Sequence, residues 1–523
     1  FAGALSGRAT MDTLTISDDQ GAWLTLSDVV LDWDRGALFK GRLQVAELSA
    51  ADILLPRLPE PQDTADPPTP EAPGFSLPEL PVSIAIDQIA ATRVEIGEEV
   101  FGVEAYVSVD GSLSLDGGEG AASLALTKLD APGGIKVEAS YANSTEILAL
   151  DLGFDEGPDG IAATLFGLPG RPSVDFSVKG EAPVTSFTAD IRLATDSTER
   201  LTGRISTSQP EGSEPGTLRA AASLSGDIAP LFTPDYRPFF GPDIRIGTVV
   251  TSFPDGRLAI SDLNLSAAAI TLAGDVDIGP DGLPEKMNIR GEISSEAGAV
   301  LLPVSGPATR VDRVDLDVQF DAAEKDGWTG DFHVLGLRRA GFSAKELNLG
   351  GRGRIVSGPA ASVSAAIEFS ATELDLGNPE ATQALGEAVS GSAQIDWTSG
   401  APLRLSDLRI DGETYALDGS ADVSFASNGP AISGKAEFMA DELAAFSGLA
   451  GRTLGGAVTF STEFEVEPLA GNFDVSAKGS SNDLIVSHPQ ADRILAGTAE
   501  LDLTARRDET GISARLATLR SPN

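Results

Sequence analysis

Hydrophobic and polar residues alternate with a period of two along most of the chain. Segments 135–139, 174–178 and 316–320 carry Ile, Val, Leu, Phe or Ala at every second position, with Lys, Glu, Asp, Ser or Gln between them. Successive side chains of a strand point to opposite faces, so this pattern predicts strands with one apolar and one polar face. Turn signals such as FPDG at 253–256 and GPDG at 279–282 separate such segments. The fold class predicted from the pattern is all-β, with a mostly antiparallel sheet.

One motif recurs in these strands. LTLSDVVL at 24–31, LAISDLNL at 258–265 and LRLSDLRI at 403–410 each place Ser-Asp between two apolar pairs, and looser copies occupy 43–48 and 84–89. The extra residue predicts a β-bulge, which would keep both apolar pairs on one face while the strand bends. Because the copies are unequally spaced, they do not support a β-helix with regular rungs. A meandering sheet with variable loops fits better.

The predicted organisation has three parts. A strand-rich segment at 1–55 is followed by a Pro-rich, acidic linker or exposed loop at 56–81 and by a continuous strand-rich region at 82–523. Short helical insertions are predicted in the third part at three places: 228–240, 378–391 and 440–452. The sequence opens on FAGALSG without Met and stops at LATLRSPN in mid-pattern, so we expect a fragment truncated at both ends.

Composition narrows the classes of function. The chain has 523 residues, 78 Asp and Glu against 37 Lys and Arg, and a formal net charge of −41. This balance argues against nucleic acid as a partner and against a basic patch on an anionic membrane. The chain has no Cys, which excludes disulfides, thiolate zinc sites and Cys nucleophiles. The longest apolar run, at 299–304, is far shorter than the roughly 18–20 residues of a membrane-spanning helix.

Motifs that would indicate catalysis or metal binding are missing from the sequence. There is no GxSxG, no Walker GxxxxGK[ST] and no HExxH. His333 lies in an alternating strand and His488 precedes Pro489, so structural roles are expected for both. DVDIGPDG at 275–282 lacks a ligand position of the EF-hand, and GGEGAA at 117–122 lacks the Asp of calcium-binding nonapeptide repeats. We therefore predict no catalytic residues, no metal site, no cofactor and no enzymatic activity.

Three blocks resemble the TamB family, the inner-membrane subunit of the translocation and assembly module. ADELAAFSGLAGRTLGGAVTF at 440–460 is similar to a recurring TamB segment in which a short helix leads into a strand. Residues 5–59 resemble the start of the TamB periplasmic region, and 80–102 follow a Pro-rich break as in that family. The resemblance is specific in these blocks and extends as a pattern over most of the chain. The resemblance implies that this chain is the N-terminal half of the periplasmic region of such a protein.

The resemblance implies an AsmA-like, bridge-type fold. In that fold a long, twisted, mostly antiparallel sheet curls into an elongated U-shaped groove with an apolar interior. A chain of this length could supply on the order of 30 strands, which side by side would form a groove roughly 150 Å long. The family further implies the periplasm of a Gram-negative bacterium. It also implies an inner-membrane anchor and a C-terminal region that meets a TamA-type outer-membrane barrel, both outside the present sequence.

The first functional hypothesis is a bridge-like lipid-transfer protein. It would conduct phospholipid along the groove between inner and outer membranes for outer-membrane biogenesis, with acyl chains in the groove as its partner. The predicted groove-lining residues are those on the apolar side of clearly alternating strands: Leu124, Leu126, Ile135, Val137, Val174, Phe176, Val178, Leu316, Val318 and Phe320. The alternative interpretation of the same residues is the closed core of a β-sandwich.

Two other hypotheses remain open. The resemblance also implies a translocation and assembly factor for outer-membrane or autotransporter β proteins, acting with the TamA-type barrel. Such a factor would use open sheet edges to template incoming strands. An acidic adhesin or passenger stalk is the third hypothesis, and it would be favoured by a regular rung period that the sequence lacks.

Overall fold

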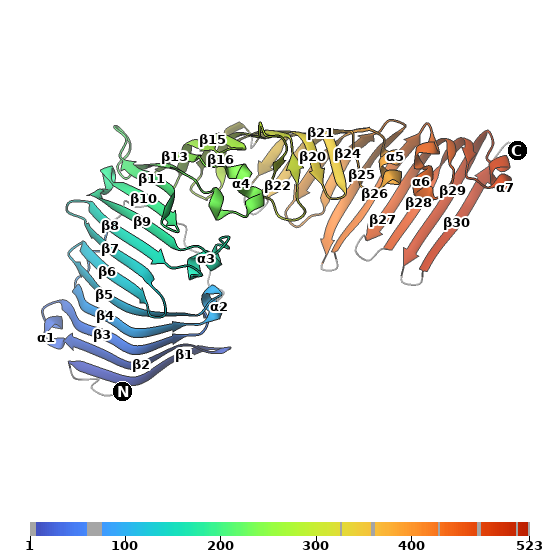
Figure 1. The fold of residues 1–523 in the computed structure, drawn as a ribbon. Coiled ribbons are helices and arrows are strands. Elements are labelled where there is room, and N and C mark those ends of the chain that lie inside the picture. The colour runs from blue at the N-terminus through green and yellow to red at the C-terminus, as the bar shows by residue number, and fades with distance from the viewer. Residues whose placement is uncertain are drawn as a thin grey trace. The chain divides into compact units, whose positions relative to one another are not determined.

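The computed structural model describes residues 7–59, 76–324, 327–356, 361–426, 429–467, 472–508 and 511–520 (Figure 1). The chain folds into two compact units. Unit 1 comprises Phe1–Ala268 and Asp277–Gly282, and unit 2 comprises Ala269–Val276 and Leu283–Asn523. The boundary between the units lies within the predicted 82–523 region. Most of the predicted linker at 56–81 lies outside the described residues.

Unit 1 is a sheet of consecutive strands. Their bounds are β1 (Arg8–Asp18), β2 (Gly21–Asp34), β3 (Arg42–Leu55), β4 (Ser83–Ile96), β5 (Ala105–Asp116), β6 (Glu119–Lys128), β7 (Gly133–Ala142), β8 (Ile147–Glu156), β9 (Val174–Pro183), β10 (Thr188–Thr195), β11 (Thr198–Ser208), β12 (Leu218–Gly226), β13 (Ile244–Ser252) and β14 (Leu258–Ser266). Each strand pairs antiparallel with the next, except that β3 and β4 are parallel. A parallel pair requires a long crossover connection, which the Pro-rich segment between these strands supplies.

Unit 2 repeats this arrangement with one detour. Its strands are β15 (Ile270–Ile278, most of it in this unit), β16 (Pro284–Ser294), β17 (Val300–Leu301), β18 (Arg310–Val311), β19 (Arg313–Asp321), β20 (Gly327–Arg339), β21 (Phe342–Val356), β22 (Ser362–Thr372), β23 (Ala388–Thr398), β24 (Leu403–Asp411), β25 (Tyr415–Ala426), β26 (Gly429–Ala440), β27 (Gly455–Glu467), β28 (Asn472–Ile485), β29 (Thr498–Asp508) and β30 (Gly511–Arg520). The short antiparallel β17–β18 pair is an insertion between β16 and β19, which pair directly with each other. From β19 to β30 each strand pairs antiparallel with its successor. An all-β, mostly antiparallel architecture is therefore confirmed in each unit.

Short helices connect or cover the strands. They are α1 (Arg35–Leu38), α2 (Glu98–Phe101), α3 (Ile161–Leu165), η1 (Val184–Ser186), η2 (Ala229–Leu231), η3 (Pro234–Tyr236), α4 (Arg237–Phe240), η4 (Ala322–Glu324), α5 (Pro379–Leu385), η5 (Leu443–Phe446), α6 (Ser447–Ala450) and α7 (Pro489–Ile494). All three segments predicted to be helical contain at least one of them. In the described part of the chain, none has the length and apolar character needed to cross a bilayer.

The predicted helix at 378–391 is shorter than expected. Asn378 caps its start, because the side-chain oxygen accepts hydrogen bonds from Glu380 N at 2.9 Å and Ala381 N at 3.2 Å. The helix ends at Leu385, and the following Gly386 has a φ of 80° that ordinary side chains adopt poorly. Residues 388–391 are already part of β23.

The Ser-Asp motif produces bulges at two of its three full copies. Asp262 and Leu263 lie opposite the single residue Thr248, and Ser406 and Asp407 lie opposite Ser420. Both Asp residues are left-handed, with φ of 53° and 49°, a conformation that Asp tolerates better than most residues.

The first copy of the motif differs from the other two. Asp28 is also left-handed, with a φ of 50°, but Ser27 and Val29 keep the same register against β1, so the predicted bulge is wrong there. Among the looser copies, Asp87 and Gln88 in β4 form a bulge against β5. A left-handed Asp is therefore shared by the full copies, whereas the bulge depends on the partner strand.

Candidate functional site

The strand register of unit 1 joins apolar residues into rows across the sheet. Residues directly opposite each other in neighbouring strands point to the same face. From β6 to β10 one row consists of Leu126, Ile135, Phe154, Phe176 and Leu193. The adjacent row consists of Leu124, Val137, Leu152, Val178 and Ile191. Six of the predicted lining residues thus lie side by side on one face.

Val174 lies two residues before Phe176 in β9 and therefore on the same face. It is opposite Glu156 in β8 and Thr195 in β10, so the apolar rows end at this level. At the opposite side of unit 1 the same face continues across β1–β4 through Leu14, Leu26, Ile53 and Val94. The apolar face therefore covers strands that are far apart in the sequence.

The three predicted residues of unit 2 lie together on a second apolar face. Leu316 is opposite Gly291 and Phe332. Val318 is opposite Ile289 and Gly330, and Phe320 is opposite Met287 and Trp328. Further along unit 2 the face includes the row Leu417, Phe438 and Phe460. Each unit therefore has one extended apolar sheet face.

These faces are only partly shielded from solvent. Of the ten predicted residues, Val174 and Phe320 are buried, with 7% and 8% exposure, Leu124 is 36% exposed, and the others are half-buried. In the described part of the chain, the largest fully buried side chain is Val311. A sandwich core would bury its large Leu, Ile and Phe side chains between two sheets. The apolar faces therefore have hydrocarbon surface left for a ligand or partner.

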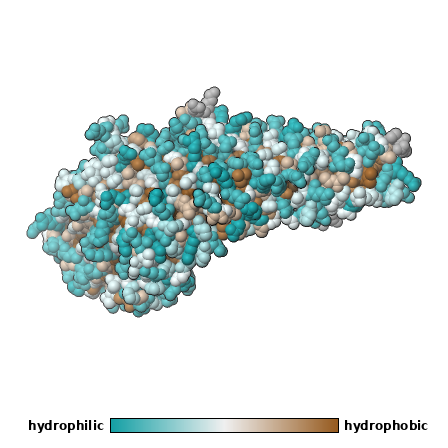
Figure 2. Space-filling view, turned by 45° about the horizontal axis from the view of Figure 1, so that its top comes forward, coloured by the Kyte–Doolittle hydropathy of each residue, from teal (hydrophilic) through white to brown (hydrophobic). Residues whose placement is uncertain are grey.

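The opposite face of each sheet is charged. Lys179 pairs with Asp151 at 3.0 Å in unit 1, and Arg290 pairs with Asp317 at 2.8 Å in unit 2. Lys136 also lies on this face, with a 64% exposed side chain. Exposed pairs of this kind contribute little stability, but they keep the face hydrophilic. Figure 2 shows a surface on which hydrophilic residues predominate and hydrophobic residues lie between them.

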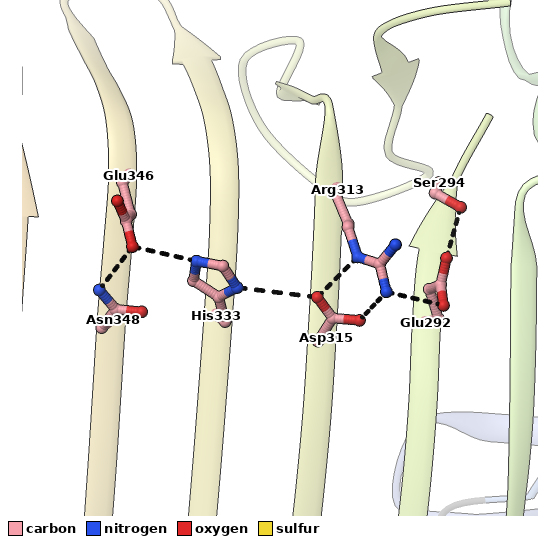
Figure 3. Close-up of polar contacts among 7 residues, drawn as sticks. All are labelled: Glu292, Ser294, Arg313, Asp315, His333, Glu346 and Asn348. Carbon is pink, nitrogen blue, oxygen red and sulfur yellow. Dashed lines mark hydrogen bonds and ion pairs between the residues drawn. The ribbon is translucent and has the colours of Figure 1, made fainter. Parts of the chain in front are cut away.

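A polar network on this face surrounds His333 (Figure 3). Its Nδ1 lies 3.7 Å from Asp315 Oδ2, and its Nε2 lies 3.2 Å from Glu346 Oε1. A hydrogen bond from Arg313 is the main cause that lowers the pKa of Asp315. A hydrogen bond from Asn348 is the main cause that lowers the pKa of Glu346, followed by one from His333. The network joins β19, β20 and β21 by side-chain contacts.

The second histidine, His488, has a structural role. His488 caps α7, because its Nδ1 accepts a hydrogen bond from Ala491 N at 3.3 Å. Within the residues that the structure covers, no group of three or more His, Cys, Asp or Glu side chains is placed to hold a metal ion.

Sequence reasoning missed one feature of the apolar face in unit 1. A cavity of about 670 Å³ lies over Phe154, Phe176 and Leu193, beneath residues of α3 and η2–η3. The Pro-rich, aromatic stretch at 228–240 was predicted to be an irregular helical insertion, with no lining role. Its aromatic content is the signal that could have indicated a cover for the apolar face.

The fold and the site define a class of protein: an all-β protein with extended, partly exposed apolar sheet faces. Comparisons with known proteins assign no family within that class. No family model, curated protein or solved structure matches the chain. The resemblance to TamB therefore stays a prediction.

Proposed function

We propose that this chain is a bridge-like lipid-transfer protein that conducts phospholipid along its apolar sheet faces. The observation that carries the proposal is the cross-strand register, which aligns partly exposed Leu, Ile, Val and Phe into continuous rows from β6 to β10. Burial of each methylene of an acyl chain on such a surface is worth about 0.8 kcal/mol. Phospholipid head groups would remain in water at the sheet rim.

The proposal includes a finer geometry and a cellular setting. The twisted sheet would curl into a U-shaped groove with the apolar face inside, as in the AsmA-like fold. The protein would act in the periplasm of a Gram-negative bacterium, anchored in the inner membrane and joined to a TamA-type outer-membrane barrel through regions outside this sequence. The resemblance of residues 5–59, 80–102 and 440–460 to TamB supports this setting.

Transport along an open face is favoured by many similar, weak positions. The rows of unit 1 provide such positions, because neighbouring strands repeat similar aliphatic side chains at nearly equal spacing. An acyl chain that moves from one strand to the next would exchange one set of contacts for an equivalent set. The free-energy differences along its path would then be small.

Site-specific photo-crosslinking tests the proposal. A photoreactive residue is placed in turn at Leu126, Val137, Val178 and Val318 on the apolar faces, and the chain is incubated with radiolabelled phosphatidylethanolamine. Lys136 and Asp317 on the polar faces are the matched controls. We expect lipid adducts at the apolar positions alone. Equal labelling of both faces, or none, would refute lipid conduction. With the same positions crosslinked in cells, adducts with polypeptide in place of lipid would favour the assembly-factor hypothesis.

A further inference from the structure

The cavity in unit 1 is a covered section of an otherwise open face. Its floor is formed by β8, β9 and β10, and its cover by α3 with the residues after it and by η2–η3. The lining residues from the floor are Phe154, Val174, Phe176, Leu193 and Thr195. Those from the cover are Ala162, Phe166, Gly167, Leu168, Leu231, Phe232, Thr233 and Tyr236.

One side of the cover is held by a buried ion pair. Glu156, at the end of β8, accepts a hydrogen bond from Ala162 N in α3 at 2.9 Å. Its other carboxylate oxygen lies 3.1 Å from Lys128 Nζ, and the two side chains are only 3% and 13% exposed. A Cβ added at Gly160 would lie 2.1 Å from the Glu156 carboxyl carbon, so the chain approaches the carboxylate closely there. These contacts fix α3 over the sheet.

The other side of the cover is an aromatic cluster. The rings of Phe232 and Phe240 stack with their centroids 3.8 Å apart, and Phe239 packs edge-on against Phe240 at 5.1 Å. Arg237 Nε donates a hydrogen bond to the Phe232 carbonyl oxygen at 3.2 Å. Phe239 is buried, and Ala268 N, just after β14, donates a hydrogen bond to the Phe240 carbonyl oxygen at 3.1 Å. The cover is thus a packed structure on both sides.

The chemistry of the cavity selects a hydrocarbon. Among the described residues that line it, none is charged, and the hydroxyl of Thr195 already accepts a hydrogen bond from Arg200 Nε at 2.7 Å. Strands β8, β9 and β10 pair on both sides, so no free strand edge faces the cavity. A bound peptide would bury amide groups without partners, which is costly. An acyl chain has no such groups.

The rim of the cavity has an exposed aromatic side chain. Phe166 lines the cavity and is 74% exposed, whereas the neighbouring Leu165 is 60% exposed and does not line the cavity. An exposed large apolar group at the edge of an apolar cavity is typical of a ligand-binding mouth. Here Phe166 extends the hydrocarbon surface from the cavity to solvent.

We propose that this cavity is a binding station that retains one acyl chain of a phospholipid while the open face on either side only passes it along. The inference rests on the proposed function and deepens it, because it assigns a preferred position to the lipid. An acyl chain enclosed on two sides loses more water contact than one on the open face. Two additional buried methylenes would retain it about tenfold longer.

The test places a photoreactive residue at Leu231 in the purified 523-residue chain, with radiolabelled phosphatidylethanolamine as the probe. Ala162→Trp fills the cavity from α3, and Leu165→Trp adds the same side chain on the same helix at a position that does not line the cavity. Phe166→Ala removes one wall at an exposed position and serves as a second, less disruptive variant. A photoreactive residue at Val318 in unit 2 reports the open face.

We expect labelling at Leu231 to fall about tenfold with Ala162→Trp, to fall several-fold with Phe166→Ala and to be unchanged with Leu165→Trp. Labelling at Val318 should not respond to any of them. Labelling at Val318 but not at Leu231, or equal effects of both Trp variants, would overturn the station and leave the proposed function intact. Labelling at Leu231 alone would show that the cavity binds an acyl chain, but it would refute conduction and with it the role of the cavity as a station. Labelling at neither position would refute both.

Discussion

The buried ion pair between Lys128 and Glu156 makes the stability of unit 1 sensitive to one substitution. In Glu156→Gln the side chain keeps a single acceptor oxygen, whereas the carboxylate of the native protein serves Lys128 Nζ and Ala162 N with separate oxygens. One of these donors must lose its partner, and the ammonium of Lys128 is left without a counter-charge at 13% exposure. Removing one member of a buried pair is therefore the relevant physical change.

The expected magnitude follows from the burial of the two side chains. Breaking a buried pair commonly costs about 3–5 kcal/mol. Because Lys128 keeps some contact with water, we expect the lower end, about 3 kcal/mol, for the opening of β6–β8 and α3. That free energy corresponds to an increase in the open population on the order of 100-fold.

Hydrogen-exchange mass spectrometry measures this opening locally and separates unit 1 from unit 2. Amides of β8 and α3 should exchange on the order of 100-fold faster in Glu156→Gln, whereas β19–β22 should be unchanged. Lys136→Gln is the matched control, since its pair with Glu138 is 64% and 52% exposed, and it should have no measurable effect.

The double variant Lys128→Met with Glu156→Gln separates the cost of an uncompensated buried charge from the cost of altered side-chain packing. Without the ammonium no uncompensated charge remains, so most of the protection in β8 and α3 should return. Exchange of Glu156→Gln at the native rate would refute the assignment of Glu156 as the anchor of α3. A double variant as unstable as the single one would refute the electrostatic explanation.

Three further predictions concern unit 2. Phe320→Ala removes a buried ring and should lower the unfolding free energy of unit 2 by about 3–5 kcal/mol, measured by urea unfolding with Trp328 fluorescence. A loss below about 1 kcal/mol would contradict the burial of Phe320. Asp407→Ala should cost about 1 kcal/mol by the same assay and Asp407→Gly less, since φ is 49°; the reverse order would contradict a left-handed requirement. The hydrogen bond from Arg313 lowers the pKa of Asp315, so this contact stabilises the folded state above the ordinary pKa of 3.8, and the stabilisation is lost as the pH falls through the lower folded pKa. Arg313→Gln should therefore flatten the acid side of the curve of unfolding free energy against pH, and an unchanged slope would contradict the contact.

Much of the fold could be predicted from local pattern alone. The alternation at 135–139 and 316–320 was sufficient to predict strands and to assign Ile135, Val137, Leu316 and Val318 to an apolar face. Side-chain direction in a strand depends only on the parity of position, which is a local property. The bulges at Asp262 and Asp407 were predicted from phase shifts in the same way, whereas the left-handed conformation of both residues was not.

The candidate site was only partly predictable, because it depends on contacts between distant segments. The bulge at Asp28 fails because β1 and β2 supply equal numbers of residues at that level, which β2 alone does not reveal. The cavity requires α3 and η2–η3 to lie over β8–β10, and α3 is held there by Glu156 of β8, which pairs with Lys128 of β6. No pattern within a single segment contains that information.

The sequence by itself determined the secondary structure, the apolar and polar sides of most strands and the acidic, solvent-exposed character of the chain. These properties follow from the period of two in a strand and from the composition. Only the tertiary structure decided that β3 and β4 are parallel, that β16 pairs with β19 across the β17–β18 insertion and that two helical segments cover part of the apolar face. Those features depend on which strands meet and in which register, and pairing between distant segments is selected by the packing of the whole sheet.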